Sequence, residues 1–299
     1  MPDERLEVVA DGGVALVGTL VRPEAAGAAP AALLLNGSGP LDRDSNMPGQ
    51  ALHVADALAA ALAARGVASL RFDKRGVGES GGRYLEASFE RETGDADAML
   101  LALGGASGVD ASRVIVVGHS VGATIAIRLA ARHDWIAGVV LLCAACESGL
   151  AVMRRQSEQI AGSLGGLQRL FAKRFLRRQE RVREELLAST ADVVRVEGQE
   201  LPAGWFREYM AYDPRPDLRA VRCPVLAITG RKDLQVEHGD VACIGELVQG
   251  SFTGLTPADL THVLRADDDA PSLSAYGAQL ERPLDADLVE TVVAWTAAR

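Results

Sequence analysis

Long hydrophobic runs are absent from this 299-residue sequence, and aromatic residues make up only 4% of it. The longest apolar segments cover residues 31–35, 114–117 and 139–146, far short of the roughly 20 residues that a membrane-spanning helix needs. Residues 1–6 carry acidic side chains where a signal peptide would carry basic ones, and no apolar segment follows them. The sequence therefore predicts a cytoplasmic protein with no membrane span.

Positive charge is also in short supply. The chain has 31 Lys and Arg residues against 40 Asp and Glu residues, which gives a net charge of −9. A general nucleic-acid-binding protein needs clustered positive charge, so we expect no nucleic-acid partner. Hydrophobic residues make up 48% and charged residues 24%, as in soluble globular proteins. A chain of this length can bury enough surface to fold without a stapling disulfide or metal.

Cysteine is scarce, with only Cys143, Cys146, Cys223 and Cys243. The close spacing of the first two could mark a redox dithiol or half of a zinc site. A zinc site would need a second close pair, which the other two cysteines do not form. A thioredoxin-like pair would open a helix, whereas this pair ends an apolar strand. We therefore expect buried, reduced cysteines with a structural role.

The order of the predicted elements indicates an α/β fold. Short apolar runs alternate with helical segments along most of the chain. The predicted strands cover residues 6–10, 14–21, 31–35, 67–72, 114–117, 139–142, 225–229 and, weakly, 251–255; the predicted helices cover residues 50–65, 89–103, 121–132 and 285–298, with one more ending near residue 247. Such alternation predicts a mostly parallel central sheet with helices on both faces. Ligands bind such sheets at the carboxyl ends of the strands, so the functional residues should lie there.

The alternation is interrupted in the middle of the chain. Between residues 147 and 222 no segment is typical of a strand, and the apolar residues of 165–187 recur at helical spacing. We therefore predict a helical cap over residues 147–216, inserted into a single α/β core formed by residues 1–146 and 217–299.

The predicted cap is basic in an acidic protein. Residues 151–190 hold nine basic and four acidic side chains. A solvated helix face would explain this excess. The alternative is that the positive charge attracts an anionic acyl substrate, such as a thioester or an ester that carries a carboxylate.

Residues 118–122 read Gly-His-Ser-Val-Gly and match the Gly-x-Ser-x-Gly pattern. The pattern alone is weak, because residues 78–82 match it too. Ser120, however, comes directly after the apolar strand at 114–117 and opens an apolar helix. A strand, a tight turn and a helix are what a nucleophile elbow needs. We predict that Ser120 is a catalytic nucleophile rather than part of an ordinary turn.

A serine hydroxyl needs a base to take its proton, and in this arrangement an acid and then a histidine follow the serine along the chain. Asp233 follows the predicted strand at 225–229, in a glycine-containing loop, and is our candidate acid. The nearest rival is Glu147, after the preceding strand. The alternative for Asp233 is a solvated loop residue or a helix cap.

Two of the five histidines, His238 and His262, come after Asp233. His238 is too close to Asp233 in the sequence to reach across the sheet edge. His262 follows the weak strand at 251–255, where the base should fall. We therefore predict His262 as the general base, against the alternative of a surface histidine.

The same chemistry needs two backbone N–H donors for an oxyanion. One should be the residue after the nucleophile, Val121. The other should come from the small residues 36–39 that follow the strand at 31–35, and we assign it to Ser38, with Gly39 as the alternative.

With these residues in place, the chain resembles the α/β-hydrolase superfamily over essentially its whole length. The resemblance rests on residues 36–44, residues 71–80, the Ser120 turn, residues 230–236 and His262. Residues 36–44 and 212–214 also resemble bacterial carboxylesterases related to dienelactone hydrolases and acyl-aminoacyl peptidases. The resemblance implies hydrolysis of a carboxylic ester or thioester through an acyl-serine. Asn36 departs from the pattern, because many members have histidine there.

The glycines at 76, 78 and 81 allow a different interpretation, because their spacing matches a dinucleotide-binding fingerprint. Three charged residues separate the strand from the first glycine, and no helix opens at the last one. We expect a structural turn, held by Asp73 and Arg75.

We therefore expect a serine hydrolase that cleaves a carboxylic ester of a small molecule. Ser120, His262 and Asp233 would act as nucleophile, base and orienting acid. Neither a metal nor an organic cofactor is implied. The same triad could serve a thioesterase, acyltransferase, peptidase or C–C bond hydrolase. A non-catalytic binding module on the same fold is the second alternative. The sequence leaves the oligomeric state open.

Overall fold

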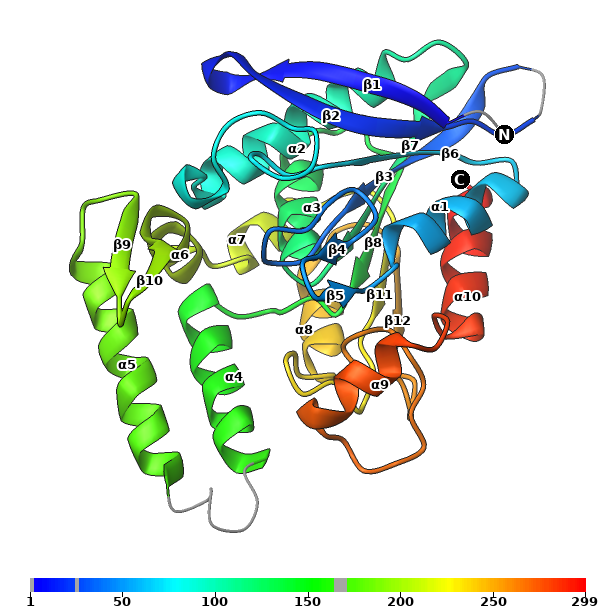
Figure 1. The fold of residues 1–299 in the computed structure, drawn as a ribbon. Coiled ribbons are helices and arrows are strands. Elements are labelled where there is room, and N and C mark those ends of the chain that lie inside the picture. The colour runs from blue at the N-terminus through cyan, green and yellow to red at the C-terminus, as the bar shows by residue number, and fades with distance from the viewer. Residues whose placement is uncertain (1–2, 25–26, 164–170) are drawn as a thin grey trace.

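Eight strands form one central sheet in the computed structural model, which describes residues 3–24, 27–163 and 171–299. Their spatial order is β1-β2-β6-β3-β7-β8-β11-β12, and every pairing from β6 to β12 is parallel (Figure 1). The strands are β1 (Asp3–Ala10), β2 (Val14–Val21), β3 (Ala29–Leu35), β6 (Ala68–Phe72), β7 (Val109–His119), β8 (Gly138–Leu142), β11 (Val225–Ile228) and β12 (Phe252–Leu255). The mostly parallel sheet predicted from the sequence is confirmed.

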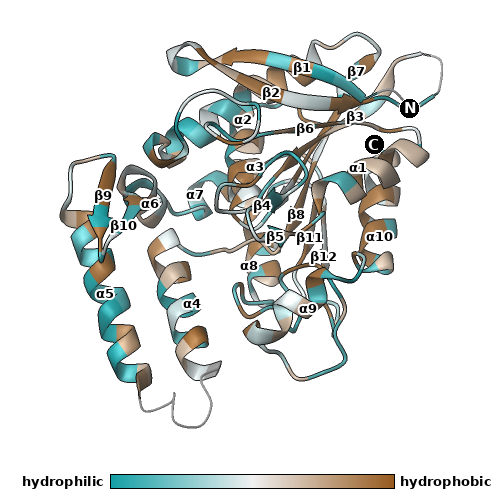
Figure 2. Cartoon of the chain, in the orientation of Figure 1, coloured by the Kyte–Doolittle hydropathy of each residue, from teal (hydrophilic) through white to brown (hydrophobic). Residues whose placement is uncertain are grey.

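The central strands are apolar because both of their faces are covered. Every residue of β6 and β8 is buried, whereas the edge strand β1 is exposed or half-buried along most of its length. Figure 2 shows the same contrast, with hydrophobic strands in the middle of the sheet. Alternate residues of β3 belong to two different core clusters, one on each face of the sheet.

Helices cover both faces of the sheet. The helices α1 and α10 pack together on one face, and α2, α3 and α8 supply apolar side chains to the other. The bounds are α1 (Ala55–Ala64), α2 (Phe89–Gly104), α3 (Val121–Arg132), α8 (Asp240–Leu247), α9 (Tyr276–Leu280) and α10 (Ala286–Ala297). No helix of the described ranges combines the length and the apolar character that crossing a bilayer requires.

Between β8 and β11 the chain leaves the sheet and forms the group of helices at the left of Figure 1. It contains α4 (Gly149–Ser163), α5 (Ala172–Ala188), β9 (Val193–Val196), β10 (Gln199–Pro202), α6 (Ala203–Ala211) and α7 (Arg215–Leu218). We expected no strand here, and the β9–β10 hairpin shows that this was wrong. Each strand has only four residues and its exposed positions are polar, so the hydrophobic pattern is too short to stand out.

Several other boundaries differ from the prediction, and β1 and β3 begin two or three residues earlier than expected. The helix expected over residues 50–65 begins at Ala55, because residues 50–51 form the short strand β5 (Gln50–Ala51), which pairs with β4 (Asn46–Met47). The strand expected at 114–117 is β7, which is longer at both ends. Leu167, Leu170 and Arg169, which entered the helical and charge patterns of the cap, lie outside the described residues.

The cysteine prediction is wrong for one pair. Cys146 and Cys243 form a disulfide, and their Cα atoms are 6.2 Å apart. Cys146 follows β8, whereas Cys243 lies on α8, which follows the neighbouring strand β11. Adjacent strands thus bring together two residues that are 97 positions apart, which spacing along the chain cannot show. Cys143 is a buried free thiol, as expected.

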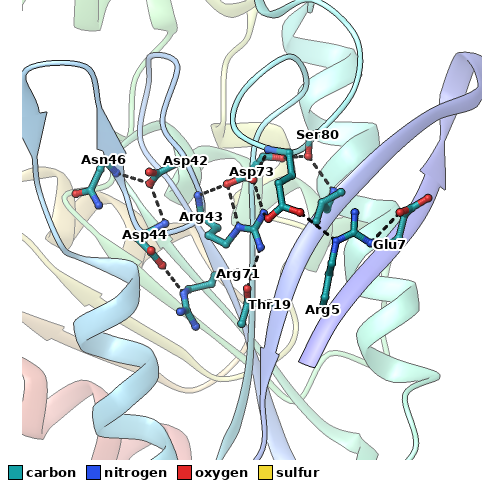
Figure 3. Close-up of polar contacts among 12 residues, drawn as sticks. Arg5, Glu7, Thr19, Asp42, Arg43, Asp44, Asn46, Arg71, Asp73 and Ser80 are labelled. Carbon is teal, nitrogen blue, oxygen red and sulfur yellow. Dashed lines mark hydrogen bonds and ion pairs between the residues drawn. The ribbon is translucent and has the colours of Figure 1, made fainter. Parts of the chain in front are cut away.

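A buried ion pair joins the loop after β3 to the loop after β6 (Figure 3). Arg43 Nη2 lies 2.6 Å from Asp73 Oδ2, and the Arg43 backbone N–H donates to Asp73 Oδ1 at 2.7 Å. The backbone N–H of Glu79 donates to Asp73 Oδ2 at 2.9 Å. Beside this pair, Arg71 Nε donates to Asp44 Oδ1 at 2.6 Å. Two of the segments that carry the family resemblance, residues 36–44 and 71–80, are therefore one connected structure.

The dinucleotide alternative does not fit this loop. A Cβ at Gly78 would lie 2.3 Å from Asp73 Oδ2, so the Asp73 carboxylate fills the space inside the glycine turn. The next element is a single turn of 3₁₀ helix at Tyr84–Glu86 rather than a helix that opens at Gly81. The loop is structural, with Arg75 held by Asp95 at 2.6 Å.

We predict that Asp73→Asn destabilises the fold in a pH-dependent way. Burial would raise the pKa of Asp73, but Arg43 and the backbone N–H groups of Glu79 and Arg43 hold it below 3.8. Its charge therefore contributes stability above the unfolded-state pKa, and this contribution is lost as the pH falls through the folded-state value. Removing one partner of a buried pair typically costs about 3–5 kcal/mol. Urea unfolding should show a loss of that order at pH 7 and a smaller one toward pH 3.

The matched control is Asp268→Asn, because Asp268 is exposed. It should change the free energy of unfolding by less than about 0.5 kcal/mol at either pH. A difference between wild type and Asp73→Asn that does not change with pH would contradict the assignment.

Candidate active site

Ser120 lies in the tight turn between β7 and α3, at the carboxyl end of the sheet. Its backbone adopts φ 56° and ψ −120°, a strained conformation for a residue with a side chain. A Cβ on Gly118 would lie 2.2 Å from the carbonyl oxygen of Gly122, and one on Gly122 would lie 2.3 Å from that of Leu35. The turn therefore needs glycine on both sides of Ser120, which is the geometry of a nucleophile elbow.

Asp233 and His262 come together from two loops beside that turn. His262 Nδ1 lies 2.8 Å from Asp233 Oδ2, and the Asp233 side chain is completely buried. The other carboxylate oxygen accepts the backbone N–H groups of Gln235 and Val236 at 2.7 and 2.9 Å. Burial would raise the pKa of Asp233, but His262 and these two donors hold it below 3.8. A carboxylate that stays charged can orient an imidazole and stabilise its protonated form.

The side chains of His119 and Cys143 both contact the backbone carbonyl oxygen of His262. His119 Nε2 lies 2.9 Å from the backbone carbonyl oxygen of His262, and the two imidazole rings are 5.1 Å apart. Burial, with the nearby His262, lowers the pKa of His119 to about 3, so His119 is neutral and donates this hydrogen bond. Burial and the nearby Asp233 raise the pKa of the Cys143 thiol. Cys143 is therefore a protonated thiol and not a rival nucleophile.

The same three residues are the candidate metal ligands of the described ranges. Ligand atoms of His119, Cys143 and His262 lie within 4.8 Å of one another. Two of the four imidazole nitrogens are already engaged, with the His262 carbonyl and with Asp233. The cluster is thus better described as the packing around the Asp233–His262 pair than as a metal site.

The loop after β3 lies directly against Ser120. A Cβ on Gly37 would come within 3.4 Å of the Ser120 Cβ, which places Gly37 beside the Ser120 side chain. Asn36, the position that departs from the family pattern, holds this loop from behind: its Nδ2 donates to the carbonyl of Asp42, and its Oδ1 accepts from the hydroxyl of Ser45, both at 2.6 Å. The side chain that stands where many family members have histidine is thus structural.

Two cavities meet at Ser120 and Ser38, which line both of them. The cap-side cavity, of about 400 Å³, lies beneath α4, β10 and α6, and Val121 also borders it. The His262-side cavity, of about 220 Å³, is lined by His262 together with Tyr276 and Leu280. The site therefore has a separate space on each side of the serine.

The rival residues are engaged elsewhere. Glu147 forms an ion pair with Arg155, and His238 is exposed on the segment that precedes α8. His53 and His133 contact Asp56 and Asp97, respectively, away from Ser120. Of the residues predicted from the sequence, the structure brings together Ser38, Ser120, Val121, Asp233 and His262.

The sequence analysis missed the side chains that shape the cap-side cavity. They are mainly apolar and come from α4 and α6: Val152, Met153, Trp205, Phe206 and Tyr209. Trp205 and Tyr209 stack with ring centroids 4.8 Å apart. The available signal was local composition, because four of the chain's few aromatic residues fall within residues 205–212.

The sequence matches a known protein family and a known esterase. Residues 49–247 match the family described as serine aminopeptidase, S33. Esterase EstD of Thermotoga maritima is 27% identical over 230 residues, which is 75% of this chain. The chain spans about half of that relative's length, 52%.

Solved structures show the same fold. Est1E from Butyrivibrio proteoclasticus, solved with ferulic acid bound, superposes with a TM-score of 0.63 at 17% identity, covering 98% of this chain and 96% of that one. The esterase domain of a Rhodothermus marinus protein gives a TM-score of 0.60 at 19% identity, covering 100% and 99%. At such identities the likeness establishes the α/β-hydrolase fold.

Replacing Asp233 should test its pairing with His262. In Asp233→Asn the imidazole loses its charged partner and its preferred tautomer, so kcat should fall by up to about 10⁴-fold, with a smaller effect on KM. Steady-state kinetics with a chromogenic ester measures both. Glu147→Gln removes the rival acid and should leave kcat within about twofold. The reverse pattern would assign the role to Glu147.

Proposed function

We propose that this chain, a member of the serine aminopeptidase S33 family of α/β-hydrolases, is a serine hydrolase that cleaves carboxylic esters of small molecules. The observation that carries the proposal is the convergence of a strained serine turn and a buried aspartate–histidine pair on one cavity. Ser120 and His262 both line that cavity, and Asp233 lies 2.8 Å behind the imidazole. The esterase names of the relatives support the same reaction.

In the proposed mechanism Ser120 Oγ attacks the ester carbonyl carbon while His262 Nε2 takes the hydroxyl proton. The carbonyl oxygen becomes an oxyanion, and the N–H groups of Ser38 and Val121 stabilise it. His262 then gives its proton to the leaving alkoxide, and the C–O bond breaks to leave an acyl-serine. Water, activated by the same imidazole, attacks the acyl carbon and releases the acid. Asp233 stays ionised throughout.

The two cavities divide the substrate between them. The imidazole must protonate the leaving group, so the alcohol portion belongs on the side of Ser120 that His262 lines. The acyl portion then occupies the larger cap-side cavity, whose walls are mainly aliphatic and aromatic. We propose esters with a bulky apolar acyl group and a small alcohol. The ferulic acid bound to Est1E is the free acid of a bulky aromatic acyl group.

Aminopeptidase activity is a second candidate, because the family description names it. The supporting observation is Glu200, an exposed acid that borders the cap-side cavity and could bind the amino group of a peptide. If this candidate is correct, the enzyme should hydrolyse aminoacyl amides to the amino acid and the amine, and Glu200→Gln should raise KM for these amides alone.

Residues 147–216 act as the cap in this proposal, over a core formed by residues 1–146 and 217–299. We propose a small-molecule ester or thioester as the partner and the cytoplasm as the location. The location rests on the sequence. The Cys146–Cys243 disulfide argues against it, because disulfides persist mainly in oxidising compartments.

A fluorophosphonate probe should label wild-type protein on Ser120 and leave Ser120→Ala unlabelled, because only an activated serine reacts with it. In parallel, a panel of chromogenic esters and thioesters of increasing acyl length should be hydrolysed by wild type alone. Intact-mass measurement and absorbance report the two results. A folded wild-type protein that is neither labelled nor active would be a binding module, and equal activity in Ser120→Ala would exclude the proposed nucleophile.

A matched pair of variants tests the division of the substrate. Val152→Phe narrows the cap-side cavity and should lower kcat/KM for bulky acyl esters by about 10- to 100-fold while sparing acetyl esters. Leu280→Phe narrows the His262-side cavity and should discriminate against bulky alcohols instead. The measurement is kcat/KM for a grid of acyl and alcohol sizes. If the two variants exchange their effects, the assignment of the cavities is reversed.

A further inference from the structure

Lys74 is a buried lysine that the mechanism above does not use. It follows β6 directly and is 7% exposed, in a chain that contains only three lysines. Its ammonium nitrogen makes two contacts: Nζ donates to the backbone carbonyl of Gly37 at 2.5 Å, and it forms an ion pair with Glu92 Oε1 at 2.6 Å. One of these two partners is therefore the loop that lies against Ser120.

The carbonyl that Lys74 binds belongs to the same peptide group as the Ser38 N–H. This peptide bond is trans, so its C=O and its N–H point in opposite directions. Fixing the Gly37 oxygen toward Lys74 therefore turns the Ser38 N–H away from Lys74. Gly37 and Ser38 line the His262-side cavity together with Ser120, whereas Lys74 lines neither cavity at Ser120.

We propose that Lys74 is a positioning residue for the oxyanion hole: it holds the Gly37–Ser38 peptide so that the Ser38 N–H points at the oxyanion. The inference rests on the proposed function and identifies what sets the geometry of one donor. Glycine at 37 gives this peptide a wide choice of backbone conformations, so a fixed carbonyl is needed to select one. Oxyanion donors act through such preorganisation, because they need no rearrangement during the reaction.

Besides fixing the direction of the Ser38 N–H, the positive charge of Lys74 makes this N–H a stronger donor. A hydrogen bond from an ammonium group to a carbonyl is stronger than one between neutral groups. Hydrogen bonds in series also polarise one another, so a charge at the C=O end of a peptide makes its N–H a better donor. Lys74 acts entirely through the peptide.

Lys74 is itself held in place by groups on two helices. Glu92, on α2, pairs with Lys74 through one oxygen and accepts the indole N–H of Trp205 at 2.6 Å through the other. Trp205 lies on α6 and lines the cap-side cavity. A buried ion pair adds little net stability, because both charges lose their hydration. This ion pair lies between the loop after β3 and the cap, so its role is to hold that loop in position rather than to add stability.

The experiment compares full-length wild type with Lys74→Met, Lys74→Gln and the double variant Lys74→Met/Glu92→Gln. The double variant removes both charges, so no unpaired carboxylate is left buried, and it decides the question if Lys74→Met does not fold. For each protein we would measure the melting temperature, kcat, KM and the inhibition constant of a trifluoromethyl ketone, whose hemiketal places an oxyanion in the hole. The matched control is Arg75→Met/Asp95→Asn, which removes the neighbouring buried ion pair.

We expect kcat of the folded Lys74→Met variants to fall by about 10- to 100-fold, somewhat less than the 10²- to 10³-fold for loss of a donor outright. KM should stay within twofold, and the inhibition constant should rise by the same factor as kcat/KM falls. Lys74→Gln, which keeps an N–H donor, should recover part of the loss. The Arg75→Met/Asp95→Asn control should keep wild-type kcat even if its melting temperature falls.

Two results would overturn the proposal: a folded double variant with wild-type kcat, or a loss of kcat with no change in the inhibition constant. A lower melting temperature with unchanged kcat would make Lys74 purely structural, which also overturns it. These results are distinct from failure of the proposed function, in which Ser120→Ala keeps its activity and the ketone inhibits no variant.

Discussion

The reversal of the chain at Ser120 is the steric constraint on which the rest of the site depends. The last residues of β7 lie between β3 and β8, and α3 begins at the next residue after the turn. The Ser120 N–H donates to the carbonyl of Leu142 on β8 at 2.8 Å, while Gly122 presses against the carbonyl of Leu35 at the end of β3. Because the turn touches both neighbouring strands, it fixes where the loop after β3 can run. A bulkier residue at Gly122 would push that loop, and Ser38 on it, away from the serine.

Three consecutive charged residues directly after β6 bind segments of the chain that surround this turn. Asp73 binds Arg43 of the loop after β3, Lys74 binds the Gly37 carbonyl, and Arg75 binds Asp95 on α2. One short segment after β6 therefore anchors two other parts of the molecule, the loop after β3 at two points and α2 at one. Buried ion pairs of this kind contribute little net stability, since desolvation offsets much of the attraction. Their value here is positional, because each fixes the distance between backbone segments that no regular hydrogen bonding joins.

Much of the core, and the candidate triad, could be predicted because each depends on a local pattern. Continuous apolar runs gave the central strands, and the position of each polar residue just after such a run gave Ser120 and Asp233. His262 was reached by chain order rather than by spacing. What escaped prediction depends on contacts between distant segments: the Cys146–Cys243 disulfide, the Lys74–Gly37 hydrogen bond and the aromatic wall of the cap. The β9–β10 hairpin escaped for another reason, since four-residue strands carry too little hydrophobic pattern.

The positions of the basic side chains in the cap indicate what its positive charge does. Several basic residues of the cap pair with acids, as Arg154 and Arg183 do with Glu180. Four exposed residues of α5 line an open hollow beside Glu197, with which Arg178 forms an ion pair: Arg174, Arg177, Arg178 and Arg181. Within the described ranges, no basic residue of the cap lines either cavity at Ser120. The excess charge therefore fits a solvated helix face better than direct contact with an anionic acyl group. The same insertion supplies aromatic side chains of α6 to the cavity at Ser120, so its contribution to that cavity is mainly apolar.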